Sequence, residues 1–199
     1  MEFYSTDREA WLYRLTESLS PVFRQAGIIL PAKVRIAPGW PLNRRAGKKT
    51  KSEAIGQCWA RRCSADGTSE IFVSPVLDDG VEVGATLIHE LIHAVDNCEH
   101  GHRGPFRKMA LAVGLTGKMR ATTAGPELKE RLNAVIGEIG PYPHARLDAD
   151  QAQGKQRTRL VKVICRRCKY AIWTTRMWLD MGTPTCVCGG QMIEVARQW

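Results

Sequence analysis

The stretch HELIHAVDNCEHGHRGPF, residues 89–106, contains four of the five histidines of the 199-residue chain. It opens with the pattern H-E-x-x-H. On an α-helix, His89 and His93 lie one turn apart on the same face, where two imidazoles can bind one Zn²⁺. Glu90 stands beside them and is placed to act as general base toward a metal-activated water. The pattern therefore predicts a zinc-dependent hydrolase site on a helix that spans about residues 81–97.

The H-E-x-x-H pattern does not identify the third residue that would bind the metal. A metzincin spacing requires glycine at position 96 and histidine at position 99, but the chain has Asp96 and Glu99. Asn97 and Gly101 can end the helix and turn the chain back toward the metal. The candidates for the third ligand are His100 and His102 in this turn, and Glu127 and Glu130 in a later helix.

HELIHA followed by GHRGPF resembles the SprT-like metalloproteases, the family that includes Spartan. In that family, H-E-x-x-H is followed by a third histidine with an aromatic residue four positions later. Phe106 lies four positions after His102, whereas Gly104 lies four after His100, so the resemblance selects His102. The usual family order, His-Gly-Pro-x-Phe, is here His-Arg-Gly-Pro-Phe.

The resemblance covers roughly residues 5–140. It implies a zincin-like fold, a catalytic zinc held by His89, His93 and His102, and Glu90 as the catalytic residue. It also implies peptide-bond hydrolysis, often directed at proteins that are bound or crosslinked to DNA.

Four cysteines near the C-terminus have the spacing of a second metal site. Cys165-x₂-Cys168 and Cys186-x-Cys188, the latter followed by two glycines, resemble the two knuckles of a zinc ribbon. The segments LVKVI and YAIWTT around the first knuckle alternate like strands. We expect the four thiolates to hold one structural Zn²⁺, since a reducing compartment disfavours disulfides.

Charge is unevenly spread along the chain. Residues 33–62 carry a net charge of +8, residues 63–100 carry −8, and residues 151–199 carry +7. Basic segments attract polyanions, so we expect a nucleic-acid partner. Packing inside the small module equally explains Trp173 and Trp178. The residues expected at a nucleic-acid surface are Arg44, Arg45, Lys48, Lys49, Lys51, Arg166, Arg167, Lys169 and Trp173.

Other polar residues have no firm assignment from the sequence. Cys58 and Cys63 are expected to face a core or a turn, and Cys98 to be a buried free thiol. The candidates for the residue that stabilises the oxyanion are Tyr142, His144 and Arg103.

The order of elements predicts an α+β fold, with a zincin-like metalloprotease domain followed by a small zinc-ribbon module. Helices are expected over about residues 6–27, 81–97, 105–115 and 126–139, and strands over about residues 33–37, 54–60 and 69–74. The expected domains are residues 1–140, a linker at residues 141–158, and the ribbon at residues 159–199. Without an apolar run of membrane-spanning length or a signal peptide, we expect a soluble cytoplasmic protein.

These features predict a zinc-dependent endopeptidase whose protein substrates are associated with DNA. One alternative is a nucleic-acid or transcription-associated binding protein with a non-proteolytic zincin domain. Another is a metal-dependent hydrolase that acts on a cell-wall peptide or a small amide.

Overall fold

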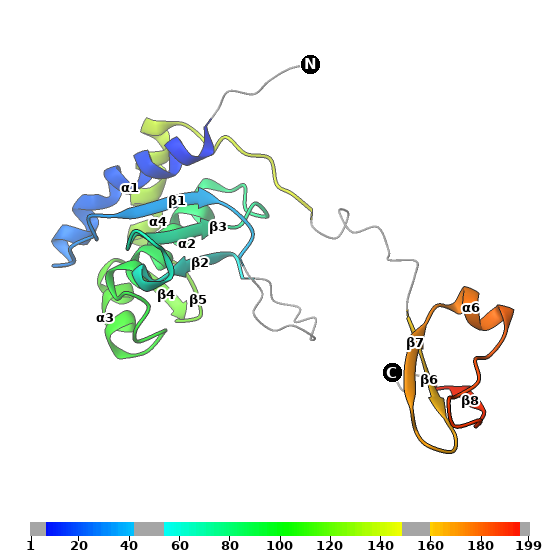
Figure 1. Ribbon diagram of the computed structural model, residues 1–199. Coiled ribbons are helices and arrows are strands. Elements are labelled where there is room, and N and C mark those ends of the chain that lie inside the picture. Colours follow the sequence, from blue (N-terminus) through cyan, green and yellow to red (C-terminus); the bar gives the residue numbers. More distant parts are fainter. Residues whose placement is uncertain (1–6, 42–53, 149–159, 196–199) are drawn as a thin grey trace. The chain divides into compact units, whose positions relative to one another are not determined.

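The computed structural model describes residues 7–41, 54–148 and 160–195 (Figure 1). The chain divides into two compact units, residues 1–148 and residues 149–199. Both units combine short strands with helices, so the chain is a mixed α+β protein. Each unit is described by itself.

A three-stranded sheet forms one layer of the first unit. Its strands are β1 (Val34–Pro38), β2 (Gly56–Trp59) and β3 (Ser69–Val73), in the order β1-β3-β2. The central strand β3 pairs with β1 in parallel and with β2 in antiparallel orientation. Alternate residues of β3 are buried, because one face of the sheet packs against helices.

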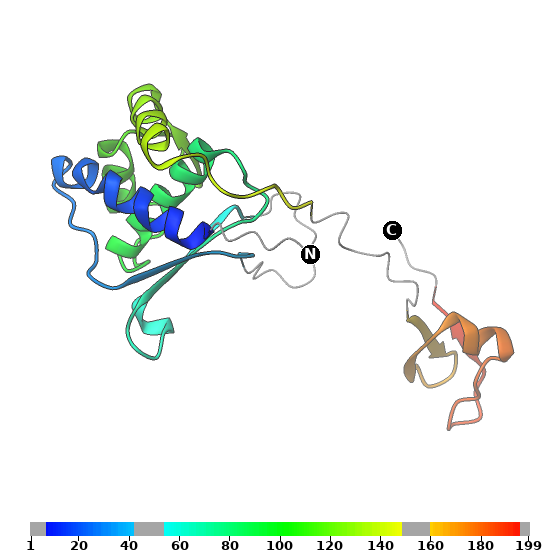
Figure 2. The same cartoon turned by 90° about the horizontal axis from the view of Figure 1, so that it is seen from above.

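Helices α1 (Arg8–Gln25), α2 (Gly80–Val95) and α4 (Pro126–Ile139) form the second layer, on one side of the sheet (Figure 2). Helix α2 contacts strands β2 and β3 as well as α1 and α4, so it is enclosed by the unit. All its residues from Val83 to Ala94 are buried. Among the described residues, no helix has the length and apolar character needed to cross a bilayer.

The chain after α2 differs from the sequence-based expectation. Helix α3 spans Gly104–Ala112 and ends there, short of the predicted residue 115. Gly114 has a φ of +90°, in the left-handed region that ends helices, and the chain then enters a hairpin that the sequence did not predict. Its strands, β4 (Leu115–Lys118) and β5 (Ala121–Ala124), pair antiparallel across a two-residue turn.

The segment that was expected to begin a linker at residue 141 packs on the first unit as far as residue 147. Tyr142 is buried, and its ring lies 4.9 Å from that of Trp11. The Trp11 indole N–H donates to the Gly140 carbonyl over 2.8 Å. The Leu147 N–H donates to the Pro75 carbonyl over 2.9 Å. The remainder of the expected linker, from residue 149, lies outside the described residues.

The second unit is a small antiparallel sheet with one short helix. Its strands are β6 (Val161–Cys165), β7 (Ala171–Thr174) and β8 (Met192–Glu194), in the order β7-β6-β8, and α6 spans Arg176–Met181. Its buried hydrophobic cluster consists of Val163, Cys165, Cys186 and Met192. So small a core leaves the unit dependent on a further crosslink.

Tyr142→Ala tests whether the segment after α4 belongs to the folded unit. Removing the ring from its buried contact with Trp11 should lower the free energy of unfolding by about 3 kcal/mol, as for other buried aromatic truncations. Leu147→Ala, in the same segment but 46% exposed, is the matched control and should have little effect. Urea denaturation of both variants measures the difference, and equal effects would contradict the packing described here.

Candidate metal centres

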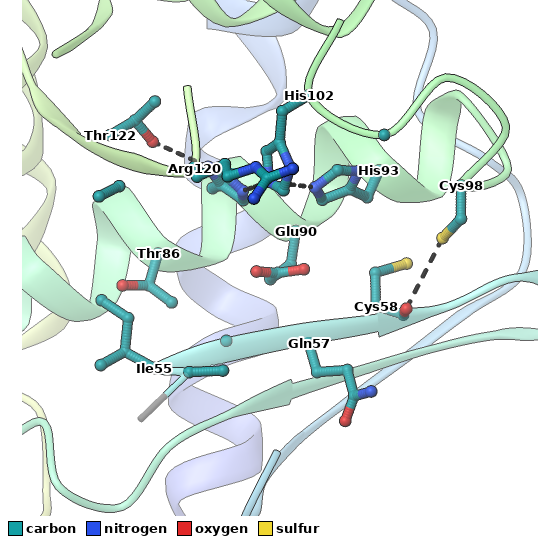
Figure 3. A pocket seen from close by; sticks show the side chains of 15 residues that line it. Ile55, Gln57, Cys58, Thr86, Glu90, His93, Cys98, His102, Arg120 and Thr122 are labelled. Atoms are coloured by element: carbon teal, nitrogen blue, oxygen red, sulfur yellow. Dashed lines mark hydrogen bonds between the residues drawn. The ribbon is translucent and has the colours of Figure 1, made fainter. Parts of the chain in front are cut away.

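Three imidazoles converge in the first unit. His89 and His93 project from the buried helix α2, and His102 comes from the loop between α2 and α3. The His102 Nε2 lies 3.1 Å from the His89 Nε2 and 3.2 Å from the His93 Nε2. Figure 3 shows His93 and His102 together above Glu90. This group can hold a metal ion.

The surroundings of the three rings fix their orientation. The His89 Nδ1 lies 2.8 Å from the Thr122 hydroxyl. With its proton on Nδ1, His89 donates to this hydroxyl and keeps the Nε2 lone pair for a metal. Phe106, which is fully buried, stacks on the His93 ring at a centroid distance of 4.4 Å and contacts the other two rings. Phe106 therefore provides the apolar surface on which the three imidazoles pack.

The nitrogen positions fit a tetrahedral metal. Three ligand nitrogens at about 2.0–2.1 Å from zinc are separated by roughly 3.3 Å, close to the separations found here. Burial lowers the pKa of His89 to about 3 and that of His93 to about 4, with the charge of neighbouring imidazoles adding to the effect. Both rings are therefore neutral at pH 7, which is the form that binds metal.

The other candidates for the third ligand lie away from the cluster. The His100 ring faces Asp96, with its Nδ1 2.6 Å from the carboxylate, and its backbone N–H donates to the same side chain. Glu127 and Glu130 are exposed on α4 and are not among the residues that line the pocket. The geometry thus brings His102, rather than these residues, to His89 and His93.

Glu90 is the buried carboxyl group of the site. Its side chain points toward strand β2 (Figure 3) and is only 6% exposed. Burial and, to a smaller extent, the charge of Cys98 raise the pKa of Glu90 to about 8, although a hydrogen bond from the Cys58 backbone opposes this. A Cβ atom at Gly56 would lie 2.6 Å from the carboxylate, so β2 approaches Glu90 closely because residue 56 is glycine.

The histidine cluster and Glu90 open onto a pocket of about 530 Å³. Strand β2 provides one part of its lining and the β4–β5 hairpin another, including Arg120 and Thr122. Among the described residues that line the pocket, Arg120 has the one side chain that is always cationic. Burial lowers the pKa of His102, and the charge of Arg120 adds to this effect. Sequence reasoning missed Arg120 and Thr122 because the hairpin has no alternating apolar pattern that predicts strands.

The three residues proposed from the sequence to stabilise an oxyanion do not line this pocket. Tyr142 is packed against Trp11, and the His144 Nε2 lies 2.8 Å from the Pro75 carbonyl. Arg103 is the exposed residue that precedes α3. Tyr142 and His144 instead anchor the end of the first unit.

Two cysteines line the same pocket. The Cys98 thiol lies 3.6 Å from the Cys58 carbonyl oxygen, as the dashed line in Figure 3 marks. The neighbouring Cys58 thiol lowers the pKa of Cys98, whereas the Cys98 thiol and burial raise that of Cys58. Cys58 and Cys98 are half-buried, whereas Cys63 is exposed.

The four C-terminal cysteines form the second cluster that can hold a metal ion. The Cys165 and Cys188 sulfurs are 3.6 Å apart, and the Cys168 and Cys186 sulfurs are 3.4 Å apart. Backbone hydrogen bonds to the Cys165 sulfur, including one of 3.3 Å from Arg167, lower its pKa to about 6 and so favour the thiolate. A tetrahedral zinc with Zn–S bonds of about 2.3 Å separates its sulfurs by roughly 3.8 Å, so a modest expansion accommodates the ion.

The residues expected to bind nucleic acid fall into two groups. Arg166, Arg167 and Lys169 are exposed around the first knuckle of the second unit. Trp173 and Trp178 are 58% and 55% exposed, so packing inside the module does not account for them. The remaining residues, Arg44, Arg45, Lys48, Lys49 and Lys51, lie outside the described residues.

Comparison with known proteins identifies no relative of this chain. The chain matches no protein-family model, no curated protein and no solved structure. Function is therefore inferred from the geometry of the two clusters and of the pocket.

Glu90→Gln should change stability in a pH-dependent way in the metal-free protein. Between the ordinary glutamate pKa of 4.5 and about 8, the unfolded chain has lost the Glu90 proton while the folded chain retains it. This linkage reduces wild-type stability as pH rises through that range. The stabilising effect of Glu90→Gln should therefore be larger at pH 8 than at pH 5 by about 3 kcal/mol.

Urea denaturation in the presence of a chelator measures this difference. Glu130→Gln, at an exposed position of α4, is the matched control for loss of a carboxylate. A gain from Glu90→Gln that is the same at both pH values would show that Glu90 ionises normally in the folded protein.

Metal content separates His102 from His100. Elemental analysis should find two zinc ions per wild-type chain and one in His102→Ala, because two imidazoles alone bind zinc weakly. His100→Ala removes only the contact with Asp96 and should retain both ions. Loss of zinc from His100→Ala with full retention in His102→Ala would reverse the assignment of the third ligand.

Proposed function

We propose that the chain is a zinc-dependent endopeptidase of the SprT-like type, with a zincin-like fold, that acts on proteins bound or crosslinked to DNA. The observation that carries this proposal is the convergence of the His89, His93 and His102 Nε2 atoms on a pocket that also exposes the Glu90 carboxyl group. A three-histidine site leaves a coordination position for water or substrate, as catalytic zinc sites require.

Glu90 supplies the acid–base chemistry in this mechanism. Zinc, when bound, polarises the scissile carbonyl and acidifies a water molecule. The Glu90 carboxylate accepts a proton from the attacking water and then delivers it to the nitrogen of the leaving amine. A nearby cation favours the carboxylate form, so the raised pKa of Glu90 describes the metal-free protein and falls once the cation is bound.

Arg120 is placed to stabilise negative charge on the substrate. It lines the pocket and forms no ion pair with another described residue. Arg120 is exposed, so its guanidinium is open to an anionic group of a bound substrate. We assign to Arg120 the stabilisation of the oxyanion that develops on the scissile carbonyl.

The second unit supports the part of the proposal that concerns DNA. A set of large apolar side chains is exposed on it, and basic residues stand among them. The Lys162 ammonium lies 6.0 Å from the centre of the Trp173 ring. Exposed aromatic rings next to cations can stack bases and hold phosphates, as in proteins that bind single strands. The exposed apolar residues are Leu160, Tyr170, Trp173, Met177, Trp178, Met181 and Val187.

Cleavage of a DNA-binding protein, with and without single-stranded DNA, tests the proposal. The wild type should cut the protein, and DNA should increase the rate. Glu90→Gln should retain zinc and DNA binding but lose activity by about 10²–10⁴-fold, because it removes the general base. Activity of Glu90→Gln equal to wild type would overturn the mechanism, and DNA binding by the wild type with no cleavage would favour a non-proteolytic binding protein.

The same assay tests Arg120. Arg120→Ala should lower kcat by about 10²-fold with little change in KM, since its contact is made to charge that develops in the transition state. Arg120→Lys should recover part of the loss. Lys118→Ala removes an exposed cation from the same hairpin outside the pocket lining and is the matched control. A rise in KM confined to acidic substrates would instead make Arg120 a specificity residue.

A further inference from the structure

The Cys58 and Cys98 thiols have no part in the metal chemistry of the pocket. Neither belongs to the two clusters of described residues that can hold a metal ion. Both nevertheless line the pocket, Cys58 from strand β2 and Cys98 from the loop after α2, and in Figure 3 they stand side by side at one end of it. Two thiols from separate elements thus lie close together in the lining of the pocket, where a small molecule can reach them.

Hydrogen bonds next to the pair connect the two segments that carry the thiols. The Arg61 N–H, just beyond β2, donates to the Asn97 side-chain oxygen over 3.1 Å. The Arg62 guanidinium donates to the Asn97 carbonyl over 3.3 Å. With the contact between the Cys98 thiol and the Cys58 carbonyl, these bonds tie the strand to the loop. The two segments that carry Cys58 and Cys98 are therefore held next to each other.

We propose that Cys58 and Cys98 are a modification site, at which glutathione disulfide or a similar small disulfide converts the two thiols into a reversible intramolecular disulfide. One protein thiolate attacks the small disulfide, forming a mixed disulfide and releasing one glutathione thiolate. The second protein thiolate then attacks the protein sulfur of the mixed disulfide and releases the second glutathione. The protein loses two protons and two electrons, and the small disulfide gains both as two thiols.

A disulfide between Cys58 and Cys98 would affect the pocket, because both residues lie close to groups of the histidine site. Cys58 provides the backbone hydrogen bond to Glu90, and Cys98 lies four positions before His102. A covalent bond between them fixes β2 against the loop that leads to the third histidine. This consequence rests on the proposed function, and we expect the oxidised protein to lose most of its peptidase activity and to regain it with a thiol reductant.

Peptide mapping of the zinc-loaded full chain, after incubation with glutathione disulfide, tests the modification itself. Trypsin leaves Cys63 and Cys98 on one peptide, so a second digestion that cuts at glutamate is needed to tell the two apart. We expect a Cys58–Cys98 crosslink that is lighter than the two free peptides by two hydrogen atoms and disappears on reduction. The crosslink should be absent in Cys58→Ser and in Cys98→Ser.

Cys63→Ser is the matched control, because it removes an exposed cysteine of the same unit and should leave the crosslink intact. Recovery of Cys58 joined to Cys63, of separate glutathione adducts, or of unmodified Cys58 and Cys98 would each overturn the proposal. The mapping needs no enzymatic activity, so its failure is distinct from failure of the proposed function. A crosslink without any effect on peptide cleavage would overturn only the consequence for the pocket.

Discussion

The burial of polar groups on helix α2 is the constraint on which the rest of the first unit depends. His89, Glu90 and His93 belong to a helix that is buried on every side from Val83 to Ala94. Each of these groups loses hydration, which is why the pKa values of the histidines are lowered and that of Glu90 is raised. Hydrophobic residues at these positions would stabilise the helix better. A bound divalent cation would offset this cost of burial, because it binds the neutral imidazoles and favours the carboxylate.

The elements around α2 can be understood as the supports of this arrangement. Helix α3 brings Phe106 under the imidazoles, and the loop before it delivers His102. The β4–β5 hairpin provides Thr122, which orients His89. Strand β2 approaches Glu90 where residue 56 is glycine. The third histidine, the hydroxyl that orients His89 and the aromatic ring that packs on the imidazoles come from separate segments. The site therefore forms only when the whole unit is folded.

The sequence predicted the parts of the site that are local in the chain. The H-E-x-x-H spacing and its apolar neighbours indicate a helix and place two histidines and a carboxyl group on it, and the cysteine spacing indicates the second cluster. The hairpin was missed because its short polar strands carry no periodic signal, and Arg120 and Thr122 were missed with it. Spacing alone also left His100 and His102 equivalent. The choice between them depends on Asp96, which faces His100, and on Phe106, which packs beside His102.

The two clusters differ in what the surrounding fold contributes. The histidine cluster lies within a large hydrophobic core that includes Trp11, Phe23 and Phe106, so packing holds its ligands in place. Two of the four buried hydrophobic residues described in its unit, Cys165 and Cys186, belong to the cysteine cluster, so the cluster itself forms part of the core. The fold of the first unit therefore has sources of stability other than a metal. A metal at the second site would be coupled to folding, because without it little apolar surface remains to hold the sheet.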